Sequence, residues 1–513
     1  MAETADVVET VKQGYAFEGA AIELGALLAG DEPKPEAAVR IPLSMVNRHG
    51  LVAGATGTGK TKTLQLMAEQ LSAAGVSVFA ADIKGDLSGI SQPGQESEKL
   101  LARTKTIGQE WTATGFPTEF YALGGQGTGI PIRATITSFG PVLLSKVLGL
   151  NDVQESSLGL IFHYADKQGL TLLDLKDLRA VITHLTSDEG KADLKELGGL
   201  SAATAGVILR ALIGFADQGA EAFFGEPEFD TADLMRERDG KGVISLLELP
   251  NLQDRPALFS TFLMWLLADL FDDLPEVGDV DKPKLVFFFD EAHLLFNDAS
   301  KAFLESIAQT VRLIRSKGVG VFFVTQTPKD VPDEVLAQLG SRVQHQLRAH
   351  TPNDAKALKA TVSTFPSSLY DLAEVLTQLG IGEAIVTVMN EKGAPTPVAW
   401  TRLRAPQSLM APATAEQLTA SVQASANNAK YTEVIDRESA YEKLAAKVQA
   451  GAEAAEAEKQ AQEQAKPEPR PRAQKEEKSM VEQVIGSSAF KQFARSAGRE
   501  IVRGLFGAAR RRR

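Results

Sequence analysis

A glycine-rich run of eight residues, GATGTGKT from Gly54 to Thr61, constrains the fold of this chain more than any other feature. A short apolar run precedes it and an amphipathic helical pattern follows it, which is the strand–loop–helix setting that such a run requires. Glycines allow the backbone to curl so that successive N–H groups point at phosphate oxygens, and the helix adds its positive N-terminal end. The run therefore predicts a phosphate-binding loop at the end of a buried strand.

The residues of this loop have distinct expected roles toward a nucleotide and its Mg²⁺. Lys60 is expected to contact the β- and γ-phosphates as a point charge, and Thr61 to bind Mg²⁺ through its hydroxyl. The chain carries no NKxD run that would read guanine, so ATP is the expected nucleotide. The predicted nucleotide-binding residues are Gly54, Ala55, Thr56, Gly57, Thr58, Gly59, Lys60, Thr61 and Lys62.

Two acidic residues directly after an apolar run form the second signal. The run 285–289 predicts a buried strand, and Asp290 and Glu291 then lie at its carboxyl edge, where ligands bind in open α/β sheets. Such a pair also occurs as a simple loop start, but the upstream phosphate loop favours a function. We expect Asp290 to hold the Mg²⁺ shell and Glu291 to orient and deprotonate the attacking water.

Several other polar residues near the ends of the expected strands have either a structural or a functional role. Gln326 follows an apolar run and is either a strand terminator or a residue that senses the γ-phosphate and positions water. Arg315 lies 11 residues earlier. Arg315 and Arg312 each either belong to a solvated helix face or stabilise transition-state charge on a neighbouring subunit's nucleotide. Asp82 follows another apolar run and either joins the Mg²⁺ shell or caps a helix.

Short apolar runs alternate with helical patterns, which is typical of an α/β fold with a mainly parallel sheet and crossover helices. The runs expected as buried strands are 51–53, 76–81, 243–249, 285–289, 319–325 and 384–388. Helical patterns over 62–74 and 302–317 separate some of them. Residues 95–240 are expected to form an insertion, with candidate strands at 119–122 and 133–137 and a largely helical remainder.

These patterns divide the chain into consecutive segments. The predicted order is a short strand-and-loop lead-in (1–47), the first part of the core (48–94), the insertion (95–240), the second part of the core (241–405), a helical arm (406–465), a charged proline-containing linker (466–478) and a basic amphipathic helix (479–513). Within the arm, residues 415–465 are rich in Ala, Glu, Gln and Lys, which predicts one long exposed helix or a coiled-coil arm.

The last segment carries a charge opposite to that of the whole chain. Residues 479–513 contain eight Lys or Arg and two Glu, and Phe490 and Phe493 lie on the apolar face of a helical wheel. This helical tail is expected to dock on a neighbouring subunit, to contact nucleic-acid phosphates or to lie on an anionic membrane.

Composition excludes several classes of protein. The chain of 513 residues has no cysteine, which excludes a disulfide scaffold, a cysteine nucleophile and a cysteine-ligated metal cluster. No signal-peptide pattern is visible, and the longest apolar stretch, 257–271, is too short for a membrane span, so we expect a cytoplasmic protein without a transmembrane segment. The net charge of −12 argues against nucleic-acid binding over the whole surface and leaves open a local basic lining.

The combination of these motifs resembles the HerA–FtsK class of P-loop ATPases, in particular its HerA-like helicase branch. The resemblance covers about residues 10–405. It is carried by His49-Gly50 before the loop, Gly54–Thr61, Asp82–Asp86, Asp290-Glu291 and the spacing from Arg315 to Gln326.

This resemblance implies a RecA-like ATPase core with a mainly parallel sheet, assembled as a hexameric ring with ATP between subunits and DNA in the central channel. Carried over by position, the implied catalytic residues are Lys60, Glu291, Gln326 and Arg315, and the implied metal ligands are Thr61 and Asp290.

Three functions remain open from the sequence. The first is a Mg²⁺-dependent, ATP-driven oligomeric motor that translocates on or unwinds DNA, and it predicts hydrolysis stimulated by nucleic acid. The second is an ATPase that remodels or transports a protein partner, with hydrolysis indifferent to DNA. The third is a nucleotide-locked assembly with slow turnover, against which the intact Glu291 argues.

Overall fold

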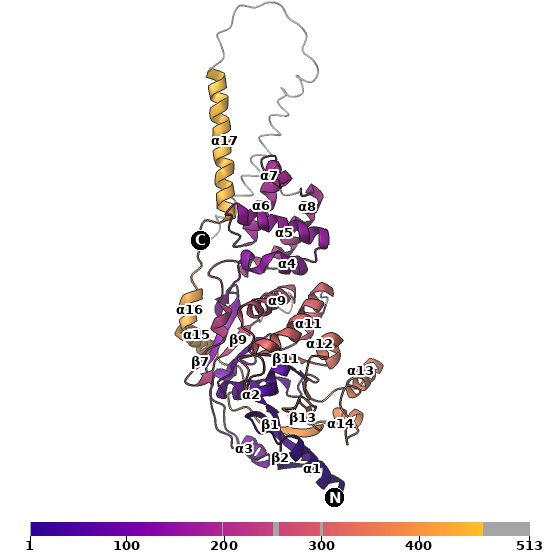
Figure 1. Cartoon of the computed structure of the whole chain (residues 1–513). Helices are drawn as coiled ribbons and strands as arrows, with labels where there is room; N and C mark the ends of the chain where they lie inside the picture. Colours follow the sequence, from indigo (N-terminus) through magenta and orange to yellow (C-terminus); the bar gives the residue numbers. More distant parts are fainter. Residues whose placement is uncertain (1, 197–198, 250–255, 298–300, 465–513) are drawn as a thin grey trace, which may run out of the picture. The chain divides into compact units, whose positions relative to one another are not determined.

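A twelve-stranded sheet forms the centre of the molecule (Figure 1). The computed structural model describes residues 2–196, 199–249, 256–297 and 301–464. Residues 1–447 form one compact unit, which contains the whole sheet. The strand order is β2-β1-β14-β13-β12-β3-β11-β10-β4-β9-β5-β6. The bounds are β1 (Ala21–Ala29), β2 (Glu32–Pro42), β3 (Gly50–Ala53), β4 (Ser77–Asp82), β5 (Thr118–Leu123), β6 (Ile130–Ile132), β9 (Ile244–Glu248), β10 (Leu285–Phe289), β11 (Val319–Thr325), β12 (Ser341–Gln344), β13 (Glu383–Thr387) and β14 (Ala399–Leu403).

The strands from β12 to β6 in this order all run parallel, whereas β13, β14, β1 and β2 extend the sheet in antiparallel fashion. The expected α/β core with a mainly parallel sheet is therefore confirmed. Every residue of β3, β4, β9, β10 and β11 is buried, which agrees with their continuous apolar runs. Because the strands are parallel, their carboxyl ends lie along one edge of the sheet.

Helices cover both faces of the sheet. The bounds are α1 (Ala2–Gly14), α2 (Lys60–Ala73), α3 (Glu98–Thr106), α4 (Ile136–Val147), α5 (Asp152–Lys167), α6 (Leu175–Thr186), α7 (Lys191–Glu196), α8 (Ala202–Asp217), α9 (Pro256–Asp273), α10 (His293–Phe296), α11 (Lys301–Ile314), α12 (Asp333–Leu336), α13 (Pro352–Val362), α14 (Leu372–Gln378), α15 (Ala415–Ala424), α16 (Ala426–Tyr431) and α17 (Ala440–Gln464). On β10, Phe287 packs in the core with α9 and α11, while Phe288 packs in the core with α1 and α2.

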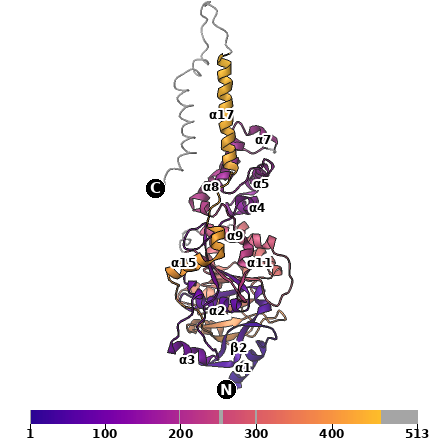
Figure 2. The same ribbon diagram turned by 90° about the vertical axis from the view of Figure 1, so that its left-hand side faces the viewer.

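The region expected as an insertion combines sheet strands with a helical group. β5 and β6 lie inside it but belong to the central sheet, next to β9. The strand expected at 119–122 is present, whereas the one expected at 133–137 is not, because β6 ends at Ile132 and α4 begins at Ile136. Thr135 caps α4 by accepting a hydrogen bond from the Ser138 N–H, which starts a helix there. Helices α4 to α8 gather beyond α9, away from α1 and α2 (Figures 1 and 2).

The lead-in and the arm both differ from the expected patterns. Residues 1–47 contain helix α1 and two long strands of the sheet rather than a short strand-and-loop segment. The single helix expected over 415–465 is divided into α15, α16 and α17. Ser425 ends α15 and its hydroxyl caps α16, which explains the first break. The predicted linker (466–478) and basic helix (479–513) lie outside the described residues.

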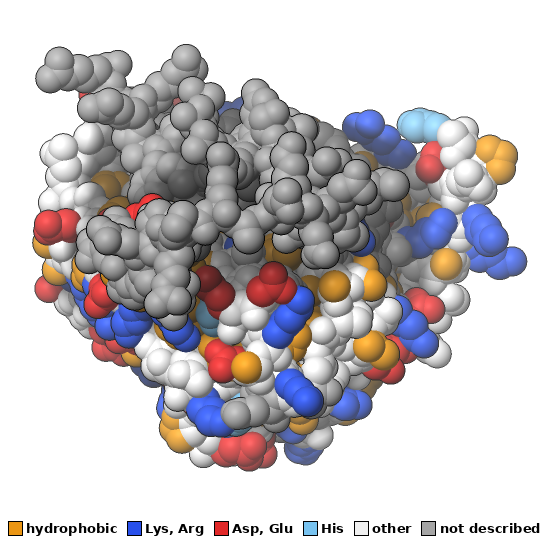
Figure 3. Space-filling view, turned by 90° about the horizontal axis from the view of Figure 1, so that it is seen from above, with side chains coloured by type: hydrophobic (Ala, Val, Ile, Leu, Met, Phe, Trp, Pro, Cys, Tyr) orange, Lys and Arg blue, Asp and Glu red, His pale blue; other side chains and the backbone are white. Residues whose placement is uncertain are grey.

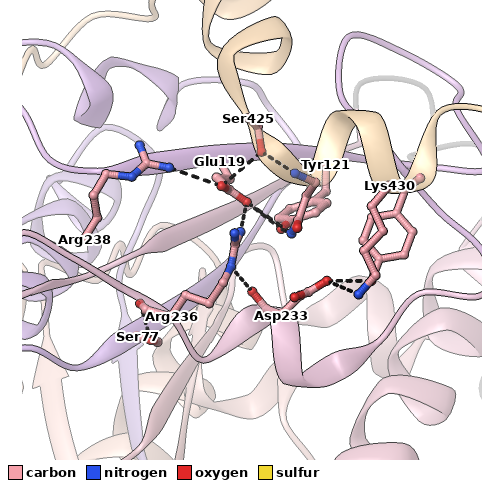
Figure 4. A network of polar contacts seen from close by, with 10 residues as sticks. Ser77, Glu119, Tyr121, Asp233, Arg236, Arg238, Ser425 and Lys430 are labelled. Atoms are coloured by element: carbon pink, nitrogen blue, oxygen red, sulfur yellow. Dashed lines mark hydrogen bonds and ion pairs between the residues drawn. The ribbon is translucent and has the colours of Figure 1, made fainter.

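A buried carboxylate fastens α15 and α16 to the sheet (Figure 4). Glu119 of β5 pairs with Arg236 and lies 3.3 Å from the Arg238 guanidinium. The Ser425 hydroxyl donates to the same carboxylate at 3.1 Å, and Tyr121 donates to it at 2.8 Å. The network holds the junction between α15 and α16 against the sheet.

Candidate functional site

The loop between β3 and α2 has the geometry of a phosphate-binding loop. The Gly54 N–H donates to the carbonyl of Thr325 at 3.2 Å and the Ala55 N–H to that of Gln346 at 2.8 Å, so the ends of β11 and β12 brace the loop. Gly59 has φ 111°, a left-handed conformation that favours glycine. A Cβ on Gly54 would lie 2.4 Å from the Cβ of His345, so only glycine fits there.

Lys60 lies buried inside the curve of this loop. Its Nζ donates to the carbonyls of Gly54 at 2.6 Å and Ala55 at 3.2 Å. Burial lowers the pKa of Lys60, and the charges of Glu291 and Asp290 oppose that effect. The ammonium is therefore held over the loop where a phosphate would bind, close to the two acids.

The acidic pair follows β10, as the sequence predicts. The Oδ1 of Asp290 accepts the Glu291 N–H at 2.9 Å, while its buried Oδ2 has no hydrogen-bond partner among the described residues. Burial, followed by the charge of Glu291, raises the pKa of Asp290 to about 7. Glu291 has φ 48°, which is uncommon for a residue with a side chain and is found at functional sites.

Glu291 is paired with Lys84, a contact that the motif analysis missed. The Lys84 ammonium donates to Oε1 of Glu291, and Nδ1 of His293 lies 3.3 Å from Oε2. Burial works to raise the pKa of Glu291, but the hydrogen bond from Lys84 and the charges of Lys84, His293 and Lys60 hold it below its ordinary value. The sequence alone does not reveal this contact, because it depends on the pairing of β4, which Lys84 follows, with β10.

Asp82 stabilises the turn after β4, which differs from the helix cap expected as its structural role. Its carboxylate accepts the backbone N–H groups of Gly85 at 2.8 Å, Asp86 at 3.3 Å and Leu87 at 2.9 Å. Both oxygens are thus engaged by the turn after β4. Asp82 holds this turn rather than capping a helix of the described chain, and it leaves Lys84 projecting from it.

Gln326 and Arg315 lie at opposite ends of the same strand. Gln326 is exposed directly after β11, which lies between β3 and β10, so it belongs to the same edge as Lys60 and Glu291. Arg315 is exposed in a turn of 3-10 helix just before β11. Since β11 has seven residues at about 3.3 Å each, Arg315 lies roughly 20 Å from its own phosphate loop. The structure therefore brings Gln326, but not Arg315, to this site.

A buried histidine under the loop is a second residue that the motifs did not reveal. The Nε2 of His345 lies 2.9 Å from the Thr63 hydroxyl of α2. Burial lowers the pKa of His345 to about 4, and the charge of Lys60 acts in the same direction. The ring is therefore neutral at physiological pH and packs directly against the loop.

The residues at this edge fit a Mg²⁺ ion held together with a nucleotide. Among the residues that the structure describes, no group of three or more His, Asp or Glu could hold a metal by itself. Mg²⁺ in nucleotide sites takes one or two protein oxygens and completes its shell with water and phosphate. The unpartnered Oδ2 of Asp290 is such an oxygen, and the Thr61 hydroxyl at the start of α2 would be the second.

Comparison with known protein families shows to which family the chain belongs. The family model for the HerA-like helicase C-terminal region matches residues 28–513. The chain belongs to the HerA-like family. This HerA-like chain is accordingly a P-loop ATPase of the HerA–FtsK class, as the motifs imply.

Curated relatives share low identity with this HerA-like chain over much of its length. It is 22% identical over 377 residues to the DNA double-strand break repair helicase HerA of Sulfurisphaera tokodaii, covering 72% of this chain and 67% of that protein. It is 23% identical over 388 residues to the protein of the same name from Saccharolobus solfataricus, covering 74% and 68%.

Solved structures share the fold of this HerA-like chain. The bacterial conjugative coupling protein TrwB has a TM-score of 0.51 at 17% identity, with 78% of this chain and 92% of that chain covered. The plasmid coupling protein TrwB in complex with ADP and Mg²⁺ gives a TM-score of 0.52 at 17% identity, with 78% and 95% covered. The RecA-like core is confirmed by this likeness. Across the described residues, no helix combines the length and apolar character that a membrane crossing requires.

Proposed function

We propose that the chain hydrolyses ATP with Mg²⁺ at the edge formed by β3, β10 and β11, and that it uses this reaction to translocate on or unwind DNA as an oligomeric, hexameric ring. One observation carries the proposal: the buried Asp290 with its unpartnered oxygen lies beside Glu291, and the charges of both act on Lys60 of the phosphate loop. The names of the curated HerA relatives support DNA as the polymer.

Each residue has a definite task in this proposal. The loop N–H groups and Lys60 bind the phosphates, and Mg²⁺ bound at Asp290 and Thr61 neutralises charge on them. Glu291 accepts a proton from the attacking water, and Gln326 orients that water. Arg315 is directed to a neighbouring subunit's nucleotide, because it lies a full strand length from its own.

The charge of the chain and of the face in Figure 3 argues against a broad contact with DNA. The face in Figure 3 mixes Lys and Arg with Asp and Glu over its described part, and the chain carries a net charge of −12. A uniformly basic face, the usual sign of non-specific nucleic-acid binding, is not the pattern seen there. The same observation favours a protein partner as the second candidate substrate.

ATP hydrolysis with and without double- or single-stranded DNA tests the proposal. The proposal predicts stimulation by DNA, and a loss of at least about 100-fold in kcat in Glu291→Gln with ATP binding retained. Hydrolysis that is unaffected by any DNA would favour the protein partner. Full activity of Glu291→Gln would overturn the assignment of the base.

A further inference from the structure

One oxygen of the carboxylate proposed as the catalytic base is engaged in this structure. Lys84 forms an ion pair with Oε1 of Glu291, whereas Oε2, 3.3 Å from Nδ1 of His293, has no hydrogen-bond partner among the described residues. An ammonium on one oxygen stabilises the charged carboxylate and so weakens it as a base toward a water molecule. Turnover at this site, as proposed above, is therefore favoured when Lys84 leaves Glu291.

The turn that carries Lys84 is held by several hydrogen bonds, whereas its side chain is partly exposed and has Glu291 as its ion-pair partner. Three backbone N–H groups, of Gly85, Asp86 and Leu87, bind the Asp82 carboxylate, which anchors the turn. By contrast, the Lys84 side chain is 42% exposed and ends in a compact charge on a flexible stem. A fixed turn with a mobile ammonium is suited to exchanging one anionic partner for another.

We propose that Lys84 is a sensor of the terminal phosphate, which pairs with Glu291 in the empty site and transfers to the γ-phosphate when ATP binds. Lys84 projects from the end of β4, beside β10 and at the same edge as the phosphate loop. Its charge acts on Lys60, the loop residue expected at the β- and γ-phosphates, so the two ammonium groups lie near one another. This inference rests on the proposed function of the site.

The selectivity for ATP follows from charge. A terminal phosphate group carries close to two negative charges, and Glu291 carries one, so the ammonium favours the phosphate once it is present. ADP lacks that group, and with ADP bound Lys84 stays on Glu291. The base is thus released only when a phosphate is in place to be attacked.

Equilibrium binding of two nucleotides to the full chain tests the transfer. Affinities for the non-hydrolysable analogue AMP-PNP and for ADP, both with Mg²⁺, would be measured by calorimetry for wild type, Lys84→Met and Lys84→Arg. We expect Lys84→Met to lose about tenfold in AMP-PNP affinity, as for a hydrogen bond to a charged group, with ADP affinity nearly unchanged. Lys84→Arg, which keeps the charge, should restore most of the difference.

A matched control and a second variant keep the test decisive. Lys329, exposed shortly after β11 at the same edge, gives the control Lys329→Met, which should leave both affinities unchanged. In Glu291→Gln the ammonium loses its partner, so AMP-PNP should bind more tightly than to wild type. This gain should vanish in the double variant Lys84→Met/Glu291→Gln.

The possible outcomes separate this inference from the proposed function. Equal changes for AMP-PNP and ADP in Lys84→Met would overturn the sensor role, since a merely structural ion pair cannot distinguish the two nucleotides. If instead Glu291→Gln hydrolyses ATP at the wild-type rate, the proposed function of Glu291 fails, whatever the binding data for Lys84 show.

Discussion

Glu291 and Lys84 meet across the ends of two adjacent parallel strands, β10 and β4, although 207 residues separate them in the sequence. The contact places a flexible cation on the residue that we propose as the catalytic base. The order of the strands in the sheet therefore determines that Glu291 is paired with a cation in this structure, and the order of the motifs along the sequence does not reveal this.

Asp290 should confer the dependence of nucleotide binding on Mg²⁺. Asp290→Asn keeps the shape of the side chain but removes the charge, so the gain in AMP-PNP affinity that Mg²⁺ gives the wild type should fall by about tenfold or more. Titrations with Mg²⁺ and with EDTA measure this gain. Asp333→Asn, at an exposed position at the start of α12, is the matched control. An undiminished Mg²⁺ effect in Asp290→Asn would remove Asp290 from the metal site.

Arg315 should act on the nucleotide of a neighbouring subunit. Arg315→Ala should lower kcat by about 1,000-fold, as for other arginines that stabilise a phosphoryl transition state. Mixing it with Lys60→Ala should restore part of the activity, because a mixed interface joins an intact loop to an intact arginine. Arg312→Ala, also exposed and nearly one turn earlier on α11, should retain activity. Mixtures that stay inactive would argue against action in trans.

His345 should make the folded state sensitive to mild acid. Its folded pKa of about 4 lies below the ordinary value of 6.5, so the unfolded chain takes up the proton first. Stability from this group is complete above pH 6.5 and is lost as the pH falls toward 4. We expect about 2 kcal/mol of loss between roughly pH 7.5 and 5 from this histidine.

Urea unfolding of wild type and His345→Gln at both pH values measures that loss. Asp82 and Asp290, whose pKa values burial raises, act in the opposite direction, but they are present in both proteins and cancel in the comparison. The wild type should therefore lose more stability than His345→Gln. Parallel losses would show that the ring is not neutral in the fold.

Glu119 should contribute several kcal/mol to the free energy of unfolding. Glu119→Ala removes the shared partner of Arg236, Arg238 and Ser425, and we expect a loss of about 3 kcal/mol in the free energy of unfolding. Arg238→Ala should cost less than about 1 kcal/mol, since half of that side chain is exposed. Chemical denaturation compares the two. A small change in the free energy of unfolding in Glu119→Ala would mean that water satisfies Arg236, Arg238 and Ser425 equally well.

The core strands were predictable because burial on both faces leaves a continuous apolar run. Leu285–Phe289 and Val319–Thr325 carry this signal in full, and the motifs at their ends identify the site edge. By contrast, β2 has prolines and charges, and β12 is only Ser341–Gln344, so neither shows a period that exceeds chance. Their place depends on partners far along the chain.

The same limit explains what the motifs missed at the site. Lys84 lies inside the Asp82–Asp86 run, but that run does not reveal its partner, and His345 belongs to no motif. The importance of both residues arises only when β4 lies beside β10 and β12 beside β3. The break between α15 and α16 carried a local signal, the capping Ser425, but helix-forming composition on both sides outweighed it.

Strand β11 lies between Arg315 and Gln326, and all seven of its residues are buried. In the ring that we propose, the two ends of this strand would face different nucleotides. A displacement of Gln326 on loss of a phosphate would then be carried along β11 to Arg315 at the next nucleotide. Because Gln326 and Arg315 lie at opposite ends of the strand, ATP hydrolysis would pass from subunit to subunit around the proposed ring in one direction only.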